Sequence, residues 1–437
     1  MDNTIEKRIQ SLNDRLSYTR DIFAGKHEDS IRLLDEKLTE FTTRVRNGEV
    51  EDPHTEIVSL EDLFVFVEKR LEKLITPMDR VRIVRHPQRI CLRDILENVY
   101  DNFTEVGGQD EHSLDPSMLI ARAVITRRRG KKMHTQSVMV IGQEKGHGAE
   151  FRNGGSVKPW GNAKALQYMR VAETEGIPIH CYIFTPGSYP IEDYPGAAQQ
   201  IARNIYTMAG LRVPVISIIS EGGSGGAEAI GLADKRLSHG YYSVISPEGG
   251  AAIEGRLKAG QRAAPELIEH CAQNLHITAQ DNLSFGYIDS VVQEPALGAR
   301  PHHFDFFRSL RQEVLRATDE VVITNTNRIA DMCEPISPVR PDKCPPVIEN
   351  SDGMLRKICY DRAHALYGDD LPPVVEERLE RELKSIIGNG YAVMYIIAQK
   401  LVWKSNEDGY LVGSRGSGGS SLAATMSGIT EVNPLPP

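Results

Sequence analysis

The sequence predicts a layered α/β protein, and three observations predict it. From about Ser137 to Pro295, short apolar runs typical of buried strands alternate with helical segments in the order β-α-β-α-β-α-β. Two of the strands end in glycine-rich loops, where α/β folds usually bind ligands. Upstream, apolar residues from Ile5 to Phe23 recur at helical spacing. These features indicate an α/β domain preceded by helices.

The length, net charge and composition of the chain narrow the possible classes of protein. Its 437 residues predict two or three domains, and its net charge of −9 gives no basic bias toward nucleic acid. No apolar run is long enough to span a membrane, and the N-terminus is polar, so we expect a cytoplasmic protein without a membrane association. Six cysteines lie far apart without a C-x-x-C pair, which argues against a zinc ribbon, and no metal is expected.

The helical arm, to about Val45, contains two amphipathic segments. It either needs a partner surface or packs as a hairpin on its own domain, and the sequence leaves both open. The basic run RRRGKK (Arg127–Lys132) lies between apolar segments and predicts a hairpin turn. A contact to a phosphorylated ligand is the alternative for that run.

The elements of the α/β region follow from the apolar pattern. The predicted strands are SVMVIG, IPIHCYIF, VPVISIIS and YYSVIS, and the predicted helices are NAKALQYMRVAETEG, GAAQQIARNIYTMAGL and AEAIGLA. Near residue 320 the chain becomes polar and proline-rich, which predicts a linker over 321–350. Two helical segments follow, PPVVEERLERELKSIIG and YAVMYIIAQKLVWKS, and then the loop GSRGSGGSS.

The stretch GGSGG, between a predicted strand and a helix, allows several interpretations. As G-x-S-x-G, it would make Ser224 a hydrolase nucleophile, which needs Asp234 or Asp281 with His302 or His303. A dinucleotide-binding fingerprint fails, because Glu228 stands at its third glycine. A loop of backbone N–H groups that stabilises an oxyanion is favoured, and a plain packing turn is the remaining alternative.

The stretch EGGSGGAEAIGLADKRLSHGYYSVISPEGG resembles the carboxyltransferase alpha subunit of bacterial acetyl-CoA carboxylase. RHPQR, GQEKG, TPGSYP and QQIARNIYTM extend the resemblance over about residues 5–320. It implies a crotonase-like (ClpP/crotonase) fold of repeated ββα units. It implies transfer of a carboxyl group from carboxybiotin, held on a biotin carboxyl carrier protein, to acetyl-CoA, giving malonyl-CoA. It also implies a beta-subunit partner in a hetero-oligomer, inactivity without that partner, and no metal in this chain.

The resemblance also implies a site made of backbone groups, with no side-chain general base. The expected oxyanion donors are the backbone groups of Gly222, Gly223, Ser224, Gly225 and Gly226. Gly187 and Ser188 are expected to line the site. The floor of the site is expected to consist of Ser246, Pro247, Glu248 and Gly249. The chain departs from the family at Phe184 and Ile191, and AAIEGRLKAGQRAAPELIEH resembles the alpha half of fused alpha–beta chains. No beta half is expected. A non-catalytic assembly subunit is a further possibility.

The C-terminal segment, from about Thr324, resembles part of the exonuclease-containing bacterial DNA polymerase III alpha subunit. LYGDDLPPVVEERLERELKSIIGNGYAVMYIIAQKLV and DGYLVGSRGSGGSSLAATMSGITEVNPLPP carry the likeness. It implies a palm-region loop that contacts nucleotide phosphates through Gly413, Ser414, Arg415, Gly416 and Ser417, with Gly419 in place of a bulkier residue. Nucleotide or DNA binding without polymerase activity is therefore the alternative function.

The resulting domain prediction has four parts: an arm (1–80), a carboxyltransferase domain (81–320), a linker (321–350) and a polymerase-like fragment (351–437). A piece of a larger enzyme is expected to have an incomplete core and to expose apolar helix faces such as Val393–Ile397.

Overall fold

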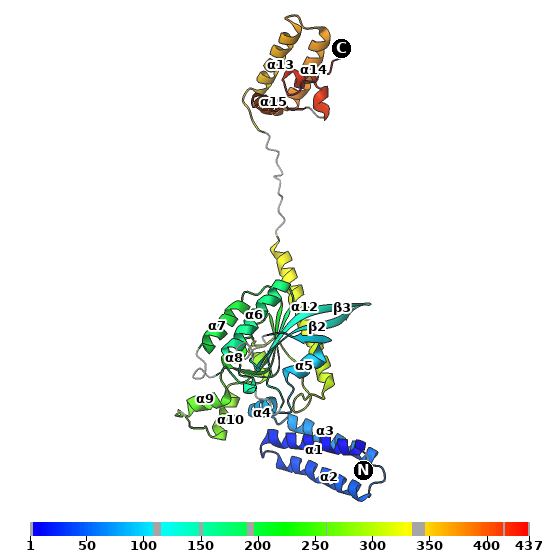
Figure 1. The fold of residues 1–437 in the computed structure, drawn as a ribbon, viewed down its shortest axis with the longest axis vertical. Helices are drawn as coiled ribbons and strands as arrows, with labels where there is room; N and C mark the ends of the chain where they lie inside the picture. Colours follow the sequence, from blue (N-terminus) through cyan, green and yellow to red (C-terminus); the bar gives the residue numbers. More distant parts are fainter. Residues whose placement is uncertain are drawn as a thin grey trace. The chain divides into compact units, whose positions relative to one another are not determined.

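The computed structural model describes residues 3–107, 115–147, 152–189, 196–258, 260–333, 346–413 and 416–435. Their contacts divide the chain into two compact units, unit 1 (Met1–Cys333) and unit 2 (Glu334–Pro437), both drawn in Figure 1.

Unit 1 is built on a mixed seven-stranded sheet in which the spatial order of the strands follows the chain order. The first three strands pair antiparallel, and every later pairing is parallel. The strands are β1 (Asn102–Glu105), β2 (Met118–Arg129), β3 (Lys132–Gln143), β4 (Ile179–Thr185), β5 (Val215–Gly223), β6 (Lys235–Ser243) and β7 (Ser290–Val291).

Helices precede the sheet, connect its strands and follow it. In unit 1 they are α1 (Asn3–Phe23), α2 (Glu28–Asn47), α3 (Pro53–Glu72), α4 (Pro77–Arg85), α5 (Leu92–Val99), the 3-10 helix η1 (Asn153–Gly155), α6 (Pro159–Glu175), α7 (Ala197–Met208), α8 (Ser224–Glu228), α9 (Pro247–Glu254), α10 (Pro265–Asn274), α11 (Ala279–Ser284) and α12 (Phe304–Met332).

The sheet is buried on both faces, which explains why its parallel strands are apolar runs rather than alternating ones. Along β5, Ile216 and Ile218 join a core with α5 and α12. Val215 and Ile219 point to the opposite face and join a core with α6. The predicted α/β class is therefore confirmed: β2, β3 and α6 follow one another as a ββα unit, and β4, β5 and β6 are each followed by a helix.

The arm is a three-helix bundle of α1, α2 and α3 (Figure 1), with a core of leucine, isoleucine and phenylalanine side chains. Asp52 caps α3, and Gly48 ends α2 in the left-handed conformation. Leu297, from the chain after β7, belongs to the same core, and its carbonyl accepts a hydrogen bond from Tyr18 Oη at 2.5 Å. The arm thus packs on its own domain, the second of the two alternatives.

Three sequence predictions for unit 1 need correction. The helix predicted at AEAIGLA begins earlier, at Ser224, and ends at Glu228, because the chain turns through Gly231 into the next strand. The strand predicted at YYSVIS is instead Lys235–Ser243, since Ser246 already caps α9. The predicted start of the linker at 321 falls inside α12, which continues to Met332 because no proline interrupts it.

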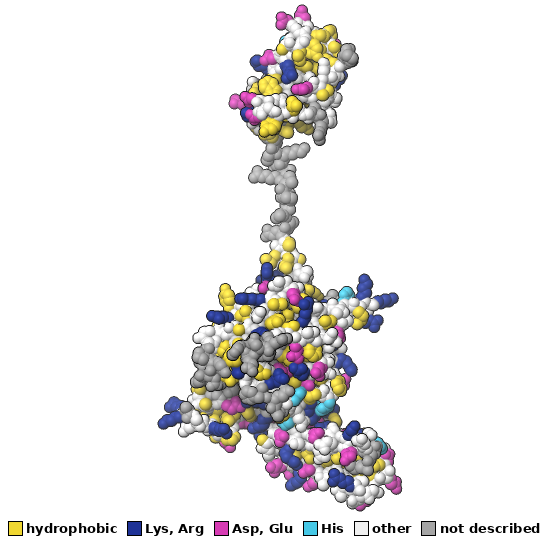
Figure 2. Space-filling view, viewed as in Figure 1, with side chains coloured by type: hydrophobic (Ala, Val, Ile, Leu, Met, Phe, Trp, Pro, Cys, Tyr) yellow, Lys and Arg dark blue, Asp and Glu magenta, His cyan; other side chains and the backbone are white. Residues whose placement is uncertain are grey.

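The basic run is a hairpin, as predicted. Arg129 pairs with Lys132, so the turn itself is only Gly130 and Lys131, and Gly130 has a positive φ of 60°. Figure 2 shows acidic and basic side chains interspersed over the drawn face of unit 1.

Unit 2 is helical: α13 (Ser351–Tyr367), α14 (Pro373–Gly388), α15 (Ala392–Glu407), the 3-10 helix η2 (Gly416–Ser420) and α16 (Leu422–Met426). Leu355, Leu379, Leu383 and Ile396 are fully buried in one core with α16. Unit 2 has a core in which α16 packs against the other helices, so the core is better formed than expected. The expected exposed apolar face is present in part, because Met394, Leu401 and Trp403 on α15 are 48–67% exposed. Within Val393–Ile397, Ile396 is buried and only Met394 is mostly exposed.

Among the helices that the structure describes, none combines the length and the apolar character that crossing a membrane requires.

Candidate active site

Two of the predicted site segments meet at the carboxyl ends of neighbouring parallel strands. Gly187 and Ser188 follow β4, and Gly222 and Gly223 end β5, where Gly222 pairs with Thr185. Ser224, Gly225 and Gly226 form the first turn of α8. The N–H groups of a first helical turn have no partner within their own helix. The structure therefore brings the glycine segment and TPGSYP together.

The two segments touch backbone to backbone. A Cβ atom on Gly223 would lie 1.9 Å from the carbonyl oxygen of Pro186, and one on Gly226 would lie 2.4 Å from the carbonyl carbon of Gly187. A Cβ on Gly225 would meet only the Ile201 side chain, at 3.7 Å. Gly223 and Gly226 are thus required for the close approach of the two loops, while Gly225 has room beside it.

Ser224 has a positive φ of 50°, as a residue on a sharp strand-to-helix turn can have. Its hydroxyl has no hydrogen-bond partner among the residues that the structure describes. The acids proposed for a hydrolase are engaged elsewhere: Asp234 accepts from Val215 N, and Asp281 caps α11. His303 accepts from Arg300 N. The geometry does not assemble a hydrolase triad around Ser224.

A buried charge cluster lies directly under the glycine segment. Glu221, the residue before it, is 1% exposed and accepts hydrogen bonds from Arg85 Nε at 2.8 Å, Lys145 Nζ at 3.0 Å and Tyr241 Oη at 3.0 Å. Burial by itself would raise the pKa of this carboxyl, but Lys145 and Arg85 outweigh burial and hold the pKa below its ordinary value. Glu221 is therefore a fixed anion that anchors β5 to two other segments.

Gln143 makes a second, neutral link below the loops. Its side chain is fully buried, accepts from Phe184 N at 3.0 Å and donates to Gly226 O at 3.2 Å. One amide thus fixes the end of β4 and the first turn of α8 relative to each other.

The third predicted segment, Ser246–Gly249, is connected to the end of β5 through Arg85. The guanidinium donates to Glu248 Oε1 at 2.7 Å as well as to Glu221. Ser246 Oγ accepts from Gly249 N at 3.0 Å and caps α9, with Pro247 as the first helical residue. Ser246–Gly249 are therefore a capped helix start that two ion pairs of Arg85, to Glu248 and to Glu221, connect to the residue before the glycine segment.

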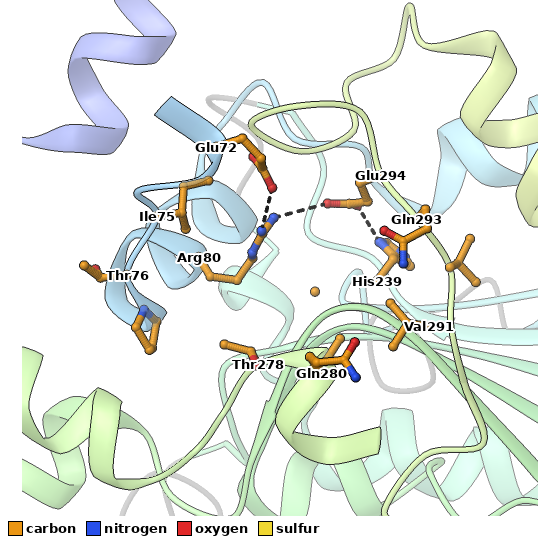
Figure 3. A pocket seen from close by; sticks show the side chains of 14 residues that line it. Glu72, Ile75, Thr76, Arg80, His239, Thr278, Gln280, Val291, Gln293 and Glu294 are labelled. Atoms are coloured by element: carbon orange, nitrogen blue, oxygen red, sulfur yellow. Dashed lines mark hydrogen bonds and ion pairs between the residues drawn. The ribbon is translucent and has the colours of Figure 1, made fainter. Parts of the chain in front are cut away.

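A cavity of about 310 Å³ lies elsewhere, between the end of the arm and the sheet (Figure 3). Arg80 points toward Glu72 and Glu294, and His239 Nδ1 lies 2.7 Å from Glu294 Oε1. Burial alone would raise the pKa of Glu294, but Arg89 and His239 outweigh it and lower the pKa to about 2. None of the predicted site residues lines this cavity, and its ion pairs connect Glu72 at the end of α3 with Arg80 of α4 and Glu294.

The predicted phosphate-contacting residues of unit 2 are only partly described. Gly413 and Gly416 are exposed, Gly416 has a φ of 70°, and Ser417 belongs to η2. Ser414 and Arg415 lie outside the described residues. Glu382 Oε2 accepts from Ser421 Oγ and Ala423 N, both at 2.9 Å, and so fixes the far end of this loop.

Sequence reasoning missed the supporting residues of the site in unit 1. Arg85 comes from RHPQR, Gln143 and Lys145 come from GQEKG, and Glu221 precedes the glycines. The available signal was a charged residue at the end of the otherwise apolar run VPVISIIS. A carboxylate there must be paired, because an unpaired buried charge is strongly unfavourable.

Two family models match the chain. The model described as acetyl co-enzyme A carboxylase carboxyltransferase-like matches residues 25–333. The bacterial DNA polymerase III alpha NTPase domain matches residues 353–436. Both matches agree with the resemblances found in the sequence.

Individual relatives also match either the carboxyltransferase-like part of the chain or its C-terminal part. The acetyl-coenzyme A carboxylase carboxyl transferase subunit alpha of Aromatoleum aromaticum is 36% identical over 296 residues, which are 66% of this chain and 85% of that protein. The PolC-type DNA polymerase III of Caldanaerobacter subterraneus subsp. tengcongensis is 63% identical over 131 residues, which are 30% of this chain. The match spans only 9% of the polymerase.

Among solved structures, the chain is similar to transcarboxylase 12S, at 19% identity and a TM-score of 0.41, over 59% of this chain and 44% of that one. The carboxyltransferase-like model covers well over half of the chain, including every strand of the sheet. The chain therefore belongs to the acetyl co-enzyme A carboxylase carboxyltransferase-like family.

Proposed function

We propose that unit 1 acts as the alpha-type half of an acetyl-CoA carboxylase carboxyltransferase in the cytoplasm. In this function a carboxyl group passes from carboxybiotin, carried on a biotin carboxyl carrier protein, to acetyl-CoA and gives malonyl-CoA. A beta subunit completes the site in a hetero-oligomer. Family membership and the alpha-subunit relative support the proposal.

The observation that carries the proposal is the backbone contact between two loops at neighbouring strand ends. Gly223 and Gly226 let Pro186 and Gly187 approach within distances that no side chain would allow. Within this packed loop, Ser224 and Gly225 are half-buried, and their small side chains leave main-chain groups there accessible to a ligand. Backbone donors held in this way stabilise an oxyanion without reorganising, by about 3–4 kcal/mol for each donor in acyl transfer.

The supporting residues give this surface its rigidity. Glu221, held by Arg85 and Lys145, fixes the end of β5, and Gln143 fixes Gly226 against Phe184. Carboxybiotin supplies the carboxyl group, and this chain's part is to orient the carbonyl oxygens and to hold charge as it develops. No side-chain general base is needed among Gly222–Gly226.

The test is an assay in the reverse direction with a supplied partner. The full chain is mixed with an acetyl-CoA carboxylase beta subunit, and malonyl-CoA-dependent carboxylation of a biotin derivative is measured. We expect activity with the mixture and none with either protein alone. A folded sample that is inactive with every beta subunit tried would overturn the proposal and favour a non-catalytic assembly role.

A second candidate function belongs to unit 2. Its 63% identity to part of a PolC-type polymerase favours binding of a nucleotide or primed DNA, without polymerase activity. The exposed Gly413 and Gly416 would let phosphates approach the main chain. Filter binding of primed DNA to the full chain, compared with a chain ending at Cys333, tests this candidate. Equal retention by both would contradict it.

A further inference from the structure

Three potential metal ligands from two separate segments converge near the start of α5. His147 Nε2 lies 2.7 Å from Asp94 Oδ2 and 3.4 Å from Cys91 Sγ. The three ligand atoms all lie within 4.8 Å of one another. The spacing of cysteines along the chain could not reveal this cluster, because it combines one cysteine with a histidine 56 residues later.

A contact with a backbone carbonyl sets the orientation of the His147 ring. Its Nδ1 lies 3.2 Å from the carbonyl oxygen of Pro87, which leaves Nε2 facing the thiol and the carboxylate. A ring nitrogen held by a backbone carbonyl, with the other nitrogen facing the metal, is the usual arrangement of metal-binding histidines.

The two segments are also fixed relative to each other. The fully buried Glu144 carboxylate accepts from Arg93 N at 2.8 Å, next to Asp94, and from Gly146 N at 2.5 Å, next to His147. Asp94 Oδ2 additionally accepts from Cys91 N at 2.7 Å, which closes the start of α5. Glu144 therefore holds the two segments together through hydrogen bonds to the backbone, while the bond from Cys91 N uses the Asp94 oxygen that faces His147.

We propose that Cys91, Asp94 and His147 bind a divalent transition-metal ion, with zinc favoured, and leave one coordination position open. Thiolate, imidazole and carboxylate together suit zinc. Tetrahedral zinc places sulfur and nitrogen ligands about 3.6 Å apart, close to the 3.4 Å observed between Cys91 Sγ and His147 Nε2. The carboxylate must move outward by about 0.6 Å, since nitrogen and oxygen ligands need about 3.3 Å.

A nucleophilic thiol activated by His147 is the competing interpretation of the same pair. Cys91 is only 1% exposed, so a substrate cannot reach its sulfur, and burial raises the pKa of the thiol. A small ion has access from the His147 side, where 41% of the side chain is exposed. Binding releases the thiol proton and the proton between His147 and Asp94, as zinc sites generally require.

Cobalt binding to the full chain tests the proposal. Purified protein is freed of metal with a chelator and titrated with Co²⁺, with absorption from thiolate-to-cobalt charge transfer as the readout and Zn²⁺ as competitor. We expect one Co²⁺ per chain with this absorption. Cys91→Ser should lose the absorption, and His147→Gln should bind at least about 100-fold more weakly. Cys333→Ser, which removes an exposed cysteine, is the matched control and should behave as the parent chain.

Glu144→Gln separates a built site from adventitious binding. It touches no ligand atom, yet loss of its support should weaken binding by about 10- to 100-fold. Circular dichroism confirms that each variant is folded, and His147→Gln, at an exposed position, remains informative if Cys91→Ser does not fold. Absence of the charge-transfer absorption in the parent chain, or equal binding by Cys91→Ser or His147→Gln, would overturn the proposal.

Discussion

Two glycine-rich loops in this chain have similar composition and opposite surroundings. In unit 1, Gly222–Gly226 continues a buried strand, and Cβ atoms on Gly223 and Gly226 would collide with the backbone of the neighbouring loop. In unit 2, Gly413 and Gly416 have nothing within 4 Å of a Cβ atom. Glycine in the first loop permits close packing, whereas in the second loop Gly416 adopts a φ of 70° that other residues rarely adopt.

The difference teaches that glycine content alone does not identify a binding loop. The first loop is rigid because Glu221, Gln143 and the strand pairing fix it from below. The second is fixed at its end by Glu382. Substitutions that add one methyl group should therefore have very different costs in the two loops.

The largest effect is expected for Gly223→Ala. Its Cβ would lie 1.9 Å from Pro186 O, a backbone atom that cannot move without separating the two loops. We expect a loss of more than about 4 kcal/mol in the unfolding free energy of unit 1, measured by chemical denaturation. Carboxyl transfer should be abolished in any sample that still folds.

Two matched variants sharpen this prediction. Gly225→Ala has its nearest contact at 3.7 Å and should change stability by less than about 1 kcal/mol. Gly416→Ala meets no atom, but its φ of 70° should cost about 1 kcal/mol in unit 2. Equal losses for Gly223→Ala and Gly225→Ala would break the distinction between the two kinds of loop.

The next effect concerns the charge under the first loop. Glu221→Gln would leave Arg85 and Lys145 without their shared carboxylate, and we expect it to destabilise unit 1 by about 3 kcal/mol. Glu248→Gln removes the other carboxylate partner of Arg85 at a position where 42% of the side chain is exposed, so its cost should stay below about 1 kcal/mol. Thermal unfolding of the two variants provides the comparison, and a similar shift for both would contradict a special role for Glu221.

Much of the fold of unit 1 could be predicted because its strands are continuous apolar runs and its helices carry clear periodicity. IPIHCYIF and VPVISIIS became β4 and β5 for this reason. Strand β6 was misplaced, since its first six residues, KRLSHG, are mostly polar in sequence and join the sheet through pairing with β5 and β7. Local pattern cannot show a burial that tertiary contacts create.

The two loops that meet were both singled out in the sequence as parts of a proposed site, but the residues that support them were not. Arg85 and Glu221 lie 136 positions apart, and Gln143 and Gly226 lie 83 apart. Nothing in the sequence around either residue indicates such a pairing. The closed core of unit 2 was also missed, because a likeness to the interior of a large enzyme does not show how α16 covers α13 and α14.

The pH dependence of the unfolding free energy should distinguish the two units. His180 is buried between Tyr100 Oη at 2.9 Å and Thr318 Oγ1 at 3.1 Å, and burial lowers its pKa to about 3. Since the unfolded pKa is about 6.5, the unfolded state binds more protons between these values, and His180 by itself should cost unit 1 about 1.4 kcal/mol per pH unit as pH falls from 6.5. Burial also lowers the pKa of His303 in unit 1 to about 3, which adds to this loss.

In unit 2, by contrast, His364 is exposed. Unfolding of unit 1, measured from pH 7 to pH 4, should therefore depend more steeply on pH than unfolding of unit 2. His180→Gln should reduce the slope of unit 1 by one proton, while the exposed His134→Gln should leave it unchanged. An unchanged slope in His180→Gln would contradict the assignment.

The smallest effect is expected for Ser224→Ala, at the centre of the first loop. The hydroxyl has no hydrogen-bond partner among the described residues, and alanine keeps the same positive-φ strain as serine. Neither the equilibrium constant of unfolding nor the rate of carboxyl transfer should therefore change by more than about twofold. The assay with a beta subunit, with Gly225→Ala alongside, measures this. If Ser224→Ala alone removed all activity, the loop would act through a side chain rather than through its main-chain groups. The hydrolase interpretation would then return, and the contrast between a packed loop and an open one would no longer explain the glycines.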